Sequence, residues 1–314
     1  MAASWLVTGG CGFIGSHLVE ALLRRGDRVR ILDDLSSGRR HAVLAGAEIV
    51  VGDVADATLV SRVMQGVDGC FHLAAVASVQ RCNEDWLSTH RTNLTGAVTI
   101  FDAARGARAG RPLPVVYASS AAVFGDNPDV PLTEAAATRP LSAYGADKLG
   151  CELHGRVASQ VHGVPTTGLR FFNVYGPRQD PSSPYSGVIA IFADRIAAGR
   201  QIEVFGDGQQ LRDFIFVSDV VACLLAAMAT SKTEARIFNV CTGRATSVLQ
   251  LAETIGSIVG NRPDIVHRPP REGDIRVSIG NPAAATAAFG LAADTAMPAG
   301  LRLTLAHQAE AAGA

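Results

Sequence analysis

Short apolar runs alternate with amphipathic segments of helical periodicity through the first half of the chain. Strands and helices in such alternation build a parallel sheet whose two faces are covered by the helices. We therefore expect an α/β fold with a doubly wound parallel sheet. The predicted strands cover residues 4–8, 29–32, 47–51, 69–73, 115–119 and 166–170, and the predicted helices cover 13–25, 57–65, 89–104 and 144–162.

The character of the sequence changes after Asn173. A polar stretch rich in Pro, Ser and Gly at 176–187 is typical of an irregular loop. A predicted helix at 188–198, a strand at 203–205 and further αβ material follow it. A chain of 314 residues can hold one large domain and a smaller one. We expect a second, smaller α/β domain after the doubly wound sheet.

A glycine-rich turn joins the first predicted strand to the first predicted helix. It reads GGCGFIG at 9–15, with the spacing GxxGxxG. Glycines so spaced allow a tight turn and let backbone N–H groups approach a pyrophosphate at the helix N-terminus. A plain strand–helix turn can also contain them, so a second signal is needed. Asp33 supplies it, because it ends the next strand at the offset of about 20 residues where a carboxylate accepts hydrogen bonds from an adenosine ribose.

The end of the second strand also indicates which dinucleotide would bind. Asp33 is followed by Asp34, and no Arg comes directly after the strand. Negative charge at this place repels the additional 2′-phosphate of NADP. The sequence therefore predicts NAD as the cofactor.

A hydroxyl, a phenol and an ammonium group follow in an order that suits proton transfer next to a bound dinucleotide. Ser120 follows a predicted strand, and Tyr144 and Lys148 lie at positions i and i+4 of a predicted helix, hence on one face. The nearby cation favours the phenolate form of the tyrosine. A YxxxK pattern arises by chance in many helices. The whole order behind a GxxGxxG turn is much less expected by accident.

Charge and apolar patterning exclude several classes of partner. The formal net charge is -1, so no field of one sign attracts nucleic acid or an acidic membrane. The first residues show no signal-peptide pattern, and the longest apolar stretch, 220–229, is shorter than the ~20 residues of a membrane span. The 6 cysteines form no CxxC pair. This predicts no metal site and no disulfide framework, and it suits a cytoplasmic protein.

The sequence also resembles the extended short-chain dehydrogenase/reductases, and more narrowly their NAD-dependent sugar epimerase/dehydratase family. The resemblance implies an NAD-binding Rossmann domain at 1–171, with a returning segment at about 213–242. It implies a nucleotide-sugar-binding domain at 172–212 and 243–314, and a homodimer formed through a bundle that includes the YxxxK helix. The matching blocks are TGGCGFIGSHL (8–18), ILDDLSSG (31–38), GDV (52–54), HLAA (72–75), TNLTG (92–96), YASSAAVFGD (117–126), SAYGADK (142–148), LRFFNVYGPRQDP (169–181), FGDGQQLRDFIFVSDV (205–220) and RPPREGD (268–274).

The same resemblance implies a role for each matching residue. Tyr144 is the acid/base, Ser120 hydrogen-bonds the sugar, and Lys148 holds the nicotinamide ribose. The implied cofactor-binding residues are Gly9, Gly12, Phe13, Ile14, Gly15, Asp33, Asp34, Ser37, Gly38, Asp53, Val54, Leu73, Ala74, Ala75, Asn93, Tyr144, Lys148 and Phe171. The implied substrate-binding residues are Ser78, Ser120, Tyr144, Asn173, Val188, Val204, Phe205, Arg212, Arg271, Asp274 and Ser278, with Asn173 and Arg212 at the UDP diphosphate and Arg271 and Asp274 at the phosphate and uridine ribose.

Two alanines after Ser120 indicate which reaction to expect. Family members that dehydrate or decarboxylate their sugar resemble a pattern with an acidic residue at this place, whereas Ala121 and Ala122 stand here. Without that acid, a 4-keto sugar can only take its hydride back, and rotation before the return inverts C4. We expect a UDP-hexose 4-epimerase. A 4,6-dehydratase or decarboxylase is one alternative, and a non-catalytic NAD sensor, which has no need of Ser120, Tyr144 and Lys148 together, is another.

The identity of the hexose depends on one position. In the family's epimerases, the residue four places after the Asp of the Gly-Asp pair gates the sugar pocket. A tyrosine there resembles enzymes limited to UDP-glucose and UDP-galactose, while a small residue admits a 2-acetamido group. Ser278 occupies the position here, and the block FNVYGPRQDP also resembles the N-acetyl-sugar subgroup. The pairs UDP-Glc/UDP-Gal, UDP-GlcNAc/UDP-GalNAc and UDP-GlcA/UDP-GalA stay open.

Overall fold

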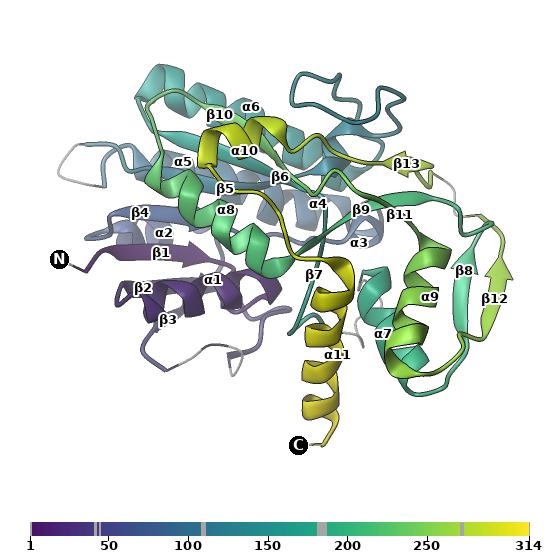
Figure 1. Ribbon diagram of the computed structural model, residues 1–314. Coiled ribbons are helices and arrows are strands. Elements are labelled where there is room, and N and C mark those ends of the chain that lie inside the picture. The colour runs from purple at the N-terminus through teal and green to yellow at the C-terminus, as the bar shows by residue number, and fades with distance from the viewer. Residues whose placement is uncertain are drawn as a thin grey trace.

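A seven-stranded parallel sheet is the centre of the larger part of the molecule (Figure 1). The computed structural model describes residues 2–40, 43, 45–107, 111–180, 187–270 and 273–313, except for the side chains of 311–313. The chain starts in mid-sheet and winds outward in both directions, so the strand order reverses between β1 and β4. In sheet order the strands are β10 (Arg236–Val240), β6 (Thr166–Phe171), β5 (Val115–Ser120), β4 (Gly69–His72), β1 (Ser4–Thr8), β2 (Arg28–Asp33) and β3 (Glu48–Val51).

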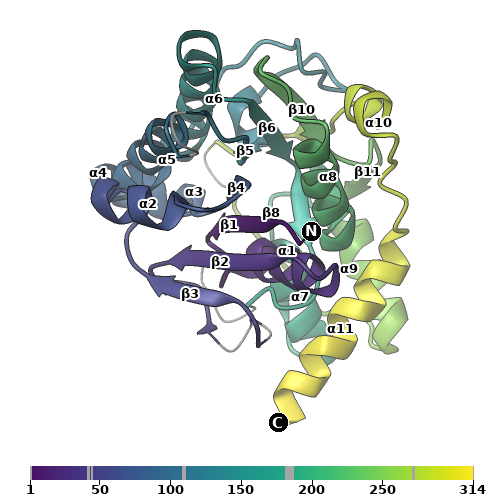
Figure 2. The ribbon, with the colours of Figure 1, turned by 90° about the vertical axis from the view of Figure 1, so that its left-hand side faces the viewer.

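Helices cover both faces of this sheet, as Figure 2 shows. Leu6 and Val7 are both fully buried, and they point into different apolar cores on opposite faces. Burial on both faces explains why the strands are continuous apolar runs. One face carries α1 (Phe13–Arg24), α8 (Val217–Ala229) and α10 (Ala283–Phe289), and the other carries α2 (Ala57–Met64), α5 (Gly96–Ala104) and α6 (Ala143–His162).

The expected doubly wound sheet is confirmed, and the predicted elements match to within one residue at each end, with one exception. The single helix expected at 89–104 begins earlier and is not uniform. It consists of α4 (Trp86–His90), a π-helical turn (Arg91–Thr95) and α5, and the shorter α3 (Val79–Glu84) precedes it. A π turn holds one residue more than an α-helical turn, and hydrophobic periodicity does not reveal it.

The second half of the chain builds a smaller sheet around β9 (Leu211–Phe216). β9 pairs with β7 (Asn173–Tyr175), β11 (Ala245–Ser247) and β13 (Val277–Ser278). A separate apolar core lies beneath these strands. It is completed by α7 (Val188–Ala197), α9 (Val248–Val259), α11 (Met297–Gly313) and the parallel pair β8 (Ile202–Phe205) and β12 (Ile265–Arg268).

The chain returns from the smaller sheet to the larger one through α8 and β10. β9 itself pairs only within the smaller sheet among the described strands. The returning segment predicted at about 213–242 therefore begins in a strand of the smaller sheet, and its contribution to the large sheet starts at Val217.

Within the described ranges, no helix has the length and apolarity needed to cross a membrane. The same residues contain no group of three or more His, Cys, Asp or Glu suited to hold a metal ion. All the cysteines are free thiols, and most are buried.

Candidate active site

The glycine-rich turn lies where the strand order reverses, between β1 and α1. Gly9 has a φ of +69°, and a Cβ there would lie 2.7 Å from the amide nitrogen of Ala74. A Cβ on Gly15 would overlap the carbonyl oxygen of Gly9. Gly12 is the N-cap of α1, and a Cβ on it would have one described atom within 4 Å, the Gly9 oxygen at 3.3 Å. The N-terminus of α1 thus faces open space, and this cradle fits the pyrophosphate of a dinucleotide.

Asp33 closes this turn from the end of β2. Its Oδ2 accepts a hydrogen bond from the Cys11 amide and its Oδ1 accepts one from the Leu35 amide, both at 2.9 Å. Burial raises the pKa of the Asp33 carboxyl, and the two amide donors oppose this shift. Each oxygen keeps a second lone pair for a ribose hydroxyl. The carboxylate therefore also orders the turn, a role that the sequence pattern did not predict.

The loops after β2 and β3 contribute the other residues assigned to the adenosine. Asp34 is exposed and accepts hydrogen bonds from the amide and hydroxyl of Ser36, and Ser37 is exposed next to it. Gly38 packs on the turn, since a Cβ there would lie 2.9 Å from the Cβ of Cys11. The remaining pair, Asp53 and Val54, follows β3, with Asp53 forming an ion pair to Arg91 at 3.2 Å and Val54 buried.

The segment 73–76 after β4 is held by two side chains. Thr8 Oγ1 accepts a hydrogen bond from the Ala74 amide at 3.2 Å. Asn93 is fully buried and binds both polar groups of Val76: its Oδ1 accepts from the amide at 2.7 Å and its Nδ2 donates to the carbonyl at 3.3 Å. The structure thus gives Asn93 a positioning role for the segment that contains Leu73, Ala74 and Ala75. Farther along, the Ser78 hydroxyl caps α3 by accepting from the Arg81 amide at 3.1 Å.

His72 ends β4 and was not among the predicted site residues. Its Nδ1 lies 2.8 Å from Thr8 Oγ1, and its Nε2 is buried with no described hydrogen-bond partner. Burial, reinforced by the charge of Lys148, lowers the pKa of His72 to about 3. The imidazole is therefore neutral at physiological pH.

Ser120 lies beside the first turn of α6. Its Oγ accepts a hydrogen bond from the Ala122 amide at 3.1 Å and so begins a 3₁₀ turn (Ala121–Phe124). That turn packs closely on α6, because a Cβ on Gly145 would lie 2.6 Å from the Ala122 carbonyl oxygen. Gly145 follows Tyr144 directly, so the fold brings the serine strand end and the tyrosine helix together, as expected.

Lys148 joins the same group from the next turn of α6. It is 2 % exposed, and its Nζ donates a hydrogen bond to the Ala118 carbonyl at 2.9 Å. The ammonium lies 5.8 Å from the centre of the Tyr144 ring. The two side chains therefore lie on the same side of α6, in line with their i, i+4 spacing.

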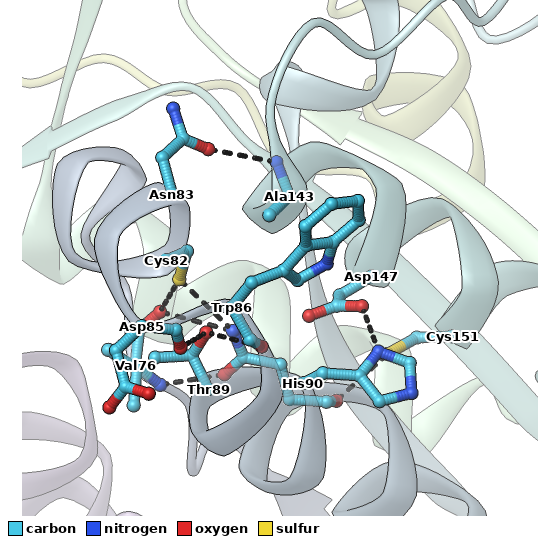
Figure 3. Close-up of polar contacts among 11 residues, drawn as sticks. Val76, Cys82, Asn83, Asp85, Trp86, Thr89, His90, Ala143, Asp147 and Cys151 are labelled. Atoms are coloured by element: carbon cyan, nitrogen blue, oxygen red, sulfur yellow. Dashed lines mark hydrogen bonds and ion pairs between the residues drawn. The ribbon is translucent and has the colours of Figure 1, made fainter.

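Contacts to the segment 79–95 hold the first two turns of α6 (Figure 3). The Asn83 side chain accepts a hydrogen bond from the Ala143 amide at 3.1 Å. His90 in α4 faces Asp147 in α6, with 2.7 Å between Nδ1 and Oδ1. Asp147 and the following residue, Lys148, are both almost completely buried. No local sequence signal points to this pairing.

A buried ion pair holds α6 on the sheet side. Glu152 accepts hydrogen bonds from Arg170 Nε at 2.8 Å and Nη2 at 2.7 Å, and from the Ser119 hydroxyl at 2.5 Å. The Arg170 guanidinium also lies 4.7 Å from the centre of the Phe124 ring. Removing one partner of such a pair typically costs 3–5 kcal/mol. α6 is thus fixed from two sides.

Three of the residues assigned to the nucleotide sugar lie on the strands of the smaller sheet. Arg212 in β9 forms an ion pair with Asp274, with Nη2 and Oδ1 at 2.6 Å. Asn173 in β7 donates to the Asp213 carbonyl at 3.0 Å, and Ser278 in β13 lies opposite Arg212 in the strand register. Burial lowers the pKa of Arg212, and Asp274 opposes the shift.

The other predicted substrate residues lie in different surroundings. Val188 begins α7, and Phe205, with Asp274, lines a cavity of about 370 Å³ between β8 and the segment around 274. Val204 is 1 % exposed and packs in the apolar core, so its side chain does not contribute to this cavity. Arg271 lies outside the described residues. On the cofactor side, Phe13 and Ile14 begin α1, and Phe171 is buried at the end of β6.

Comparisons with known proteins show the family of the chain. A sequence model of the NAD dependent epimerase/dehydratase family matches residues 5–241. A UDP-glucose 4-epimerase from Mycolicibacterium smegmatis is 38% identical over 279 residues, which are 87% of this chain and 88% of that protein.

Two solved structures are similar over almost their full length. The UDP-glucose 4-epimerase of Thermotoga maritima with UDP-glucose has a TM-score of 0.94 and 33% identity, covering 98% of this chain and 99% of that one. The UDP-N-acetylglucosamine 4-epimerase of Methanobrevibacter ruminantium, in complex with UDP-N-acetylmuramic acid, has a TM-score of 0.93 and 32% identity, covering 99% and 100%.

Proposed function

The chain belongs to the NAD dependent epimerase/dehydratase family, and on that premise we propose that it is an NAD-dependent UDP-sugar 4-epimerase. The observation that carries this choice of reaction is the 3₁₀ turn after Ser120. Ala121 and Ala122 occupy the start of the turn, and the Ala122 carbonyl packs against the helix of Tyr144. The family resemblance implies a carboxylic acid at this place in dehydratases and decarboxylases. A site that lacks this acid returns the hydride instead of completing an elimination.

The side chains at the site divide the proton chemistry among them. The glycine turn and Asp33 would hold NAD, which would supply the hydride acceptor and donor for the sugar C4. Tyr144 takes the proton of O4 as the 4-keto sugar forms and returns it at the end. Ser120 orients O4 by a hydrogen bond, and Lys148 keeps its positive charge 5.8 Å from the centre of the Tyr144 ring. The 4-keto sugar rotates between removal and return of the hydride, so the hydride returns to the opposite face and C4 is inverted.

The smaller sheet supports binding of the nucleotide. Arg212 has the guanidinium geometry that suits a diphosphate, and its partner Asp274 lines the adjacent cavity. Asn173 lies on β7, the strand that pairs with the Arg212 strand β9. Ser120 pairs with Phe171 in the strand register, two residues before Asn173, so we expect a diphosphate anchored there to direct its sugar toward the Ser120 end of β5.

One side chain, that of Ser278, bears on which pair of sugars the protein accepts. Ser278 offers little volume, which favours admission of a 2-acetamido group in addition to a 2-hydroxyl. The likeness to both a UDP-glucose and a UDP-N-acetylglucosamine 4-epimerase supports the same range. UDP-glucuronate is a further candidate substrate. The chain is 31% identical, over 95% of its length, to a UDP-glucuronate 4-epimerase of Arabidopsis thaliana.

The test is incubation of the purified protein with UDP-Glc, UDP-GlcNAc and UDP-GlcA, each followed by NMR. We expect C4 epimers to form without added oxidant or reductant. Sugar deuterated at C4 should keep its deuterium in the product. Formation of a 4-keto-6-deoxy sugar or a pentose would contradict the epimerase assignment, and binding without turnover would favour the sensor.

The assembly is also part of the proposal. Leu153, Val157 and Val161 form an exposed apolar row along α6, with 57%, 48% and 69% of their surfaces accessible. Such a row on the outer face of α6 suits a two-fold helix bundle with a second copy. Sedimentation analysis of the wild type and of Val157→Glu tests this, and a wild-type monomer would refute it.

The cytoplasmic location and the division into an NAD-binding domain (1–171 and about 213–242) and a nucleotide-sugar-binding domain (172–212 and 243–314) complete the proposal. Separate protection of the two parts by NAD and by UDP in limited proteolysis would support this division.

A further inference from the structure

Asp213 is a buried carboxylate at the point where separate segments of the smaller sheet meet. It is fully inaccessible to solvent. Its Oδ1 accepts hydrogen bonds from the Thr242 amide at 2.8 Å and the Thr242 hydroxyl at 2.7 Å. Its Oδ2 accepts from the Gly243 amide at 2.8 Å and the Gly280 amide at 3.3 Å. The carboxylate therefore joins β9 to the turn after β10 and to the chain that leaves β13.

The assigned substrate residues on the smaller sheet are each connected to Asp213 by sequence, by a hydrogen bond or by strand pairing. Arg212 is its neighbour in β9, and Asn173 donates to its backbone carbonyl at 3.0 Å. Ser278 pairs with Arg212 in register and comes two residues before Gly280. The positions of these side chains thus depend on how β9 and β13 are held together.

We propose that Asp213 is a positioning residue for the nucleotide sugar: its carboxylate fixes Arg212, Asn173 and Ser278 as one wall of the substrate site. The inference rests on the proposed function in so far as this wall binds a UDP-sugar. Asp213 itself is buried behind the wall and makes no contact with the ligand in this assignment.

The donor set explains why a carboxylate is needed. An ionised carboxylate only accepts hydrogen bonds, and here each oxygen receives two. An asparagine has the same shape, but its NH₂ group would face the Thr242 amide in one orientation and the Gly243 and Gly280 amides in the other, while the Thr242 hydroxyl could turn to accept. The isosteric change therefore loses the hydrogen bond from the Thr242 amide or those from the Gly243 and Gly280 amides.

The experiment compares Asp213→Asn with a matched control, Asp219→Asn. Asp219 accepts hydrogen bonds from the amide and hydroxyl of Thr295 at 3.2 and 2.9 Å, so it is also a carboxylate that ties two segments. It contacts none of the assigned substrate residues in the described structure. Calorimetry with UDP and with NAD, KM and kcat for UDP-glucose, and thermal unfolding are measured for each protein.

For Asp213→Asn we expect UDP to bind about tenfold more weakly or worse, with a matching rise in KM, because Arg212 and Asn173 are both positioned through β9 and a bidentate Arg–phosphate contact depends on geometry. NAD affinity should stay unchanged, and kcat at saturation should fall less than kcat/KM. For Asp219→Asn, UDP affinity should equal that of the wild type. A folded Asp213→Asn protein with wild-type UDP affinity would overturn the proposal.

Thr242→Val tests the same inference if Asp213→Asn does not fold. It removes one of the four donors, and Thr242→Ser keeps that hydroxyl. We expect a severalfold rise in the Kd for UDP with valine and recovery with serine. Lower stability with an unchanged Kd would overturn the positioning role. A wild-type protein that binds no UDP at all would refute the proposed function itself.

Discussion

The cofactor cradle and the substrate wall are built in opposite ways. The cradle uses the closely spaced glycines of the segment 9–15 and the carboxylate of Asp33, which accepts hydrogen bonds from the Cys11 amide in that segment and from the nearby Leu35 amide. The wall takes Asn173, Arg212 and Ser278 from three strands and depends on Asp213 to hold them. We therefore expect NAD binding to be lost when a side chain is added at the glycines of the cradle. We expect UDP binding to be lost when the charge of Asp213 is removed behind the wall. Binding of the two ligands should accordingly respond to different kinds of substitution.

The largest effect is expected where neither region is touched. Tyr144→Phe removes the group assigned to proton transfer and leaves the cradle and the wall intact. Turnover should fall by ~10²–10⁴, while calorimetry should show unchanged affinities for NAD and UDP. Near-normal turnover would mean that the phenol is structural. Loss of UDP affinity would mean that Tyr144 belongs to the wall.

The next effect sharpens the description of the cradle. NADP would bring its 2′-phosphate next to Asp33 and Asp34, and two unit charges about 4 Å apart repel by ~1–4 kcal/mol at effective dielectric constants between water and a protein surface. NAD should therefore bind at least tenfold more tightly than NADP. Calorimetry of both dinucleotides at low salt measures this difference. Equal affinities would remove Asp33 from the ribose site.

The residues proposed for the cradle and for proton transfer could be located in the sequence because each group has short, local spacings. GxxGxxG, the strand-end Asp33 and the i, i+4 pair Tyr144 and Lys148 are all local patterns. The hydrogen bonds of Asp213 span 29 to 67 residues along the chain, and they connect residue types that also occur in ordinary loops. Such contacts follow from strand order, which the second half of the sequence does not reveal.

The same reason explains the other omissions. Glu152 lies two turns after Tyr144 on α6, but its partner Arg170 is on the next strand. His90 and Asp147 are 57 residues apart. The π turn escaped prediction because one additional residue hardly disturbs an apolar periodicity. Only the fold brings these groups together.

A substitution in the wall should separate two substrate classes. Ser278→Tyr adds a ring where a 2-acetamido group would lie, and overpacking of this kind costs ~1–3 kcal/mol. The variant should lose most of its kcat/KM for UDP-GlcNAc and UDP-GalNAc and largely keep it for UDP-Glc and UDP-Gal. If both classes fall together, Ser278 does not line the sugar pocket.

The smallest effect concerns His72, which lies next to the cradle, and the pH dependence of the free energy of unfolding. The pKa of His72 is about 3 in the folded protein, against ~6.5 when unfolded. Between these values the unfolded chain binds more protons, so the free energy of unfolding falls as the pH falls, by ~1.4 kcal/mol per unit. His72→Asn should lose this part of the slope in denaturant titrations from pH 6 to 5. The exposed His154→Asn is the control, and identical slopes for wild type and His72→Asn would contradict the shift.

The π turn at Arg91–Thr95 sets the rotational phase between the two ends of one continuous helix. Deleting a single residue there would restore a regular α-helix and rotate one end against the other by about 100°. Asn93 would then leave the peptide of Val76, or His90 would leave Asp147, depending on which end moved. Substitutions that keep the length preserve this phase. A one-codon deletion would cost the site more than most side-chain replacements in the same segment.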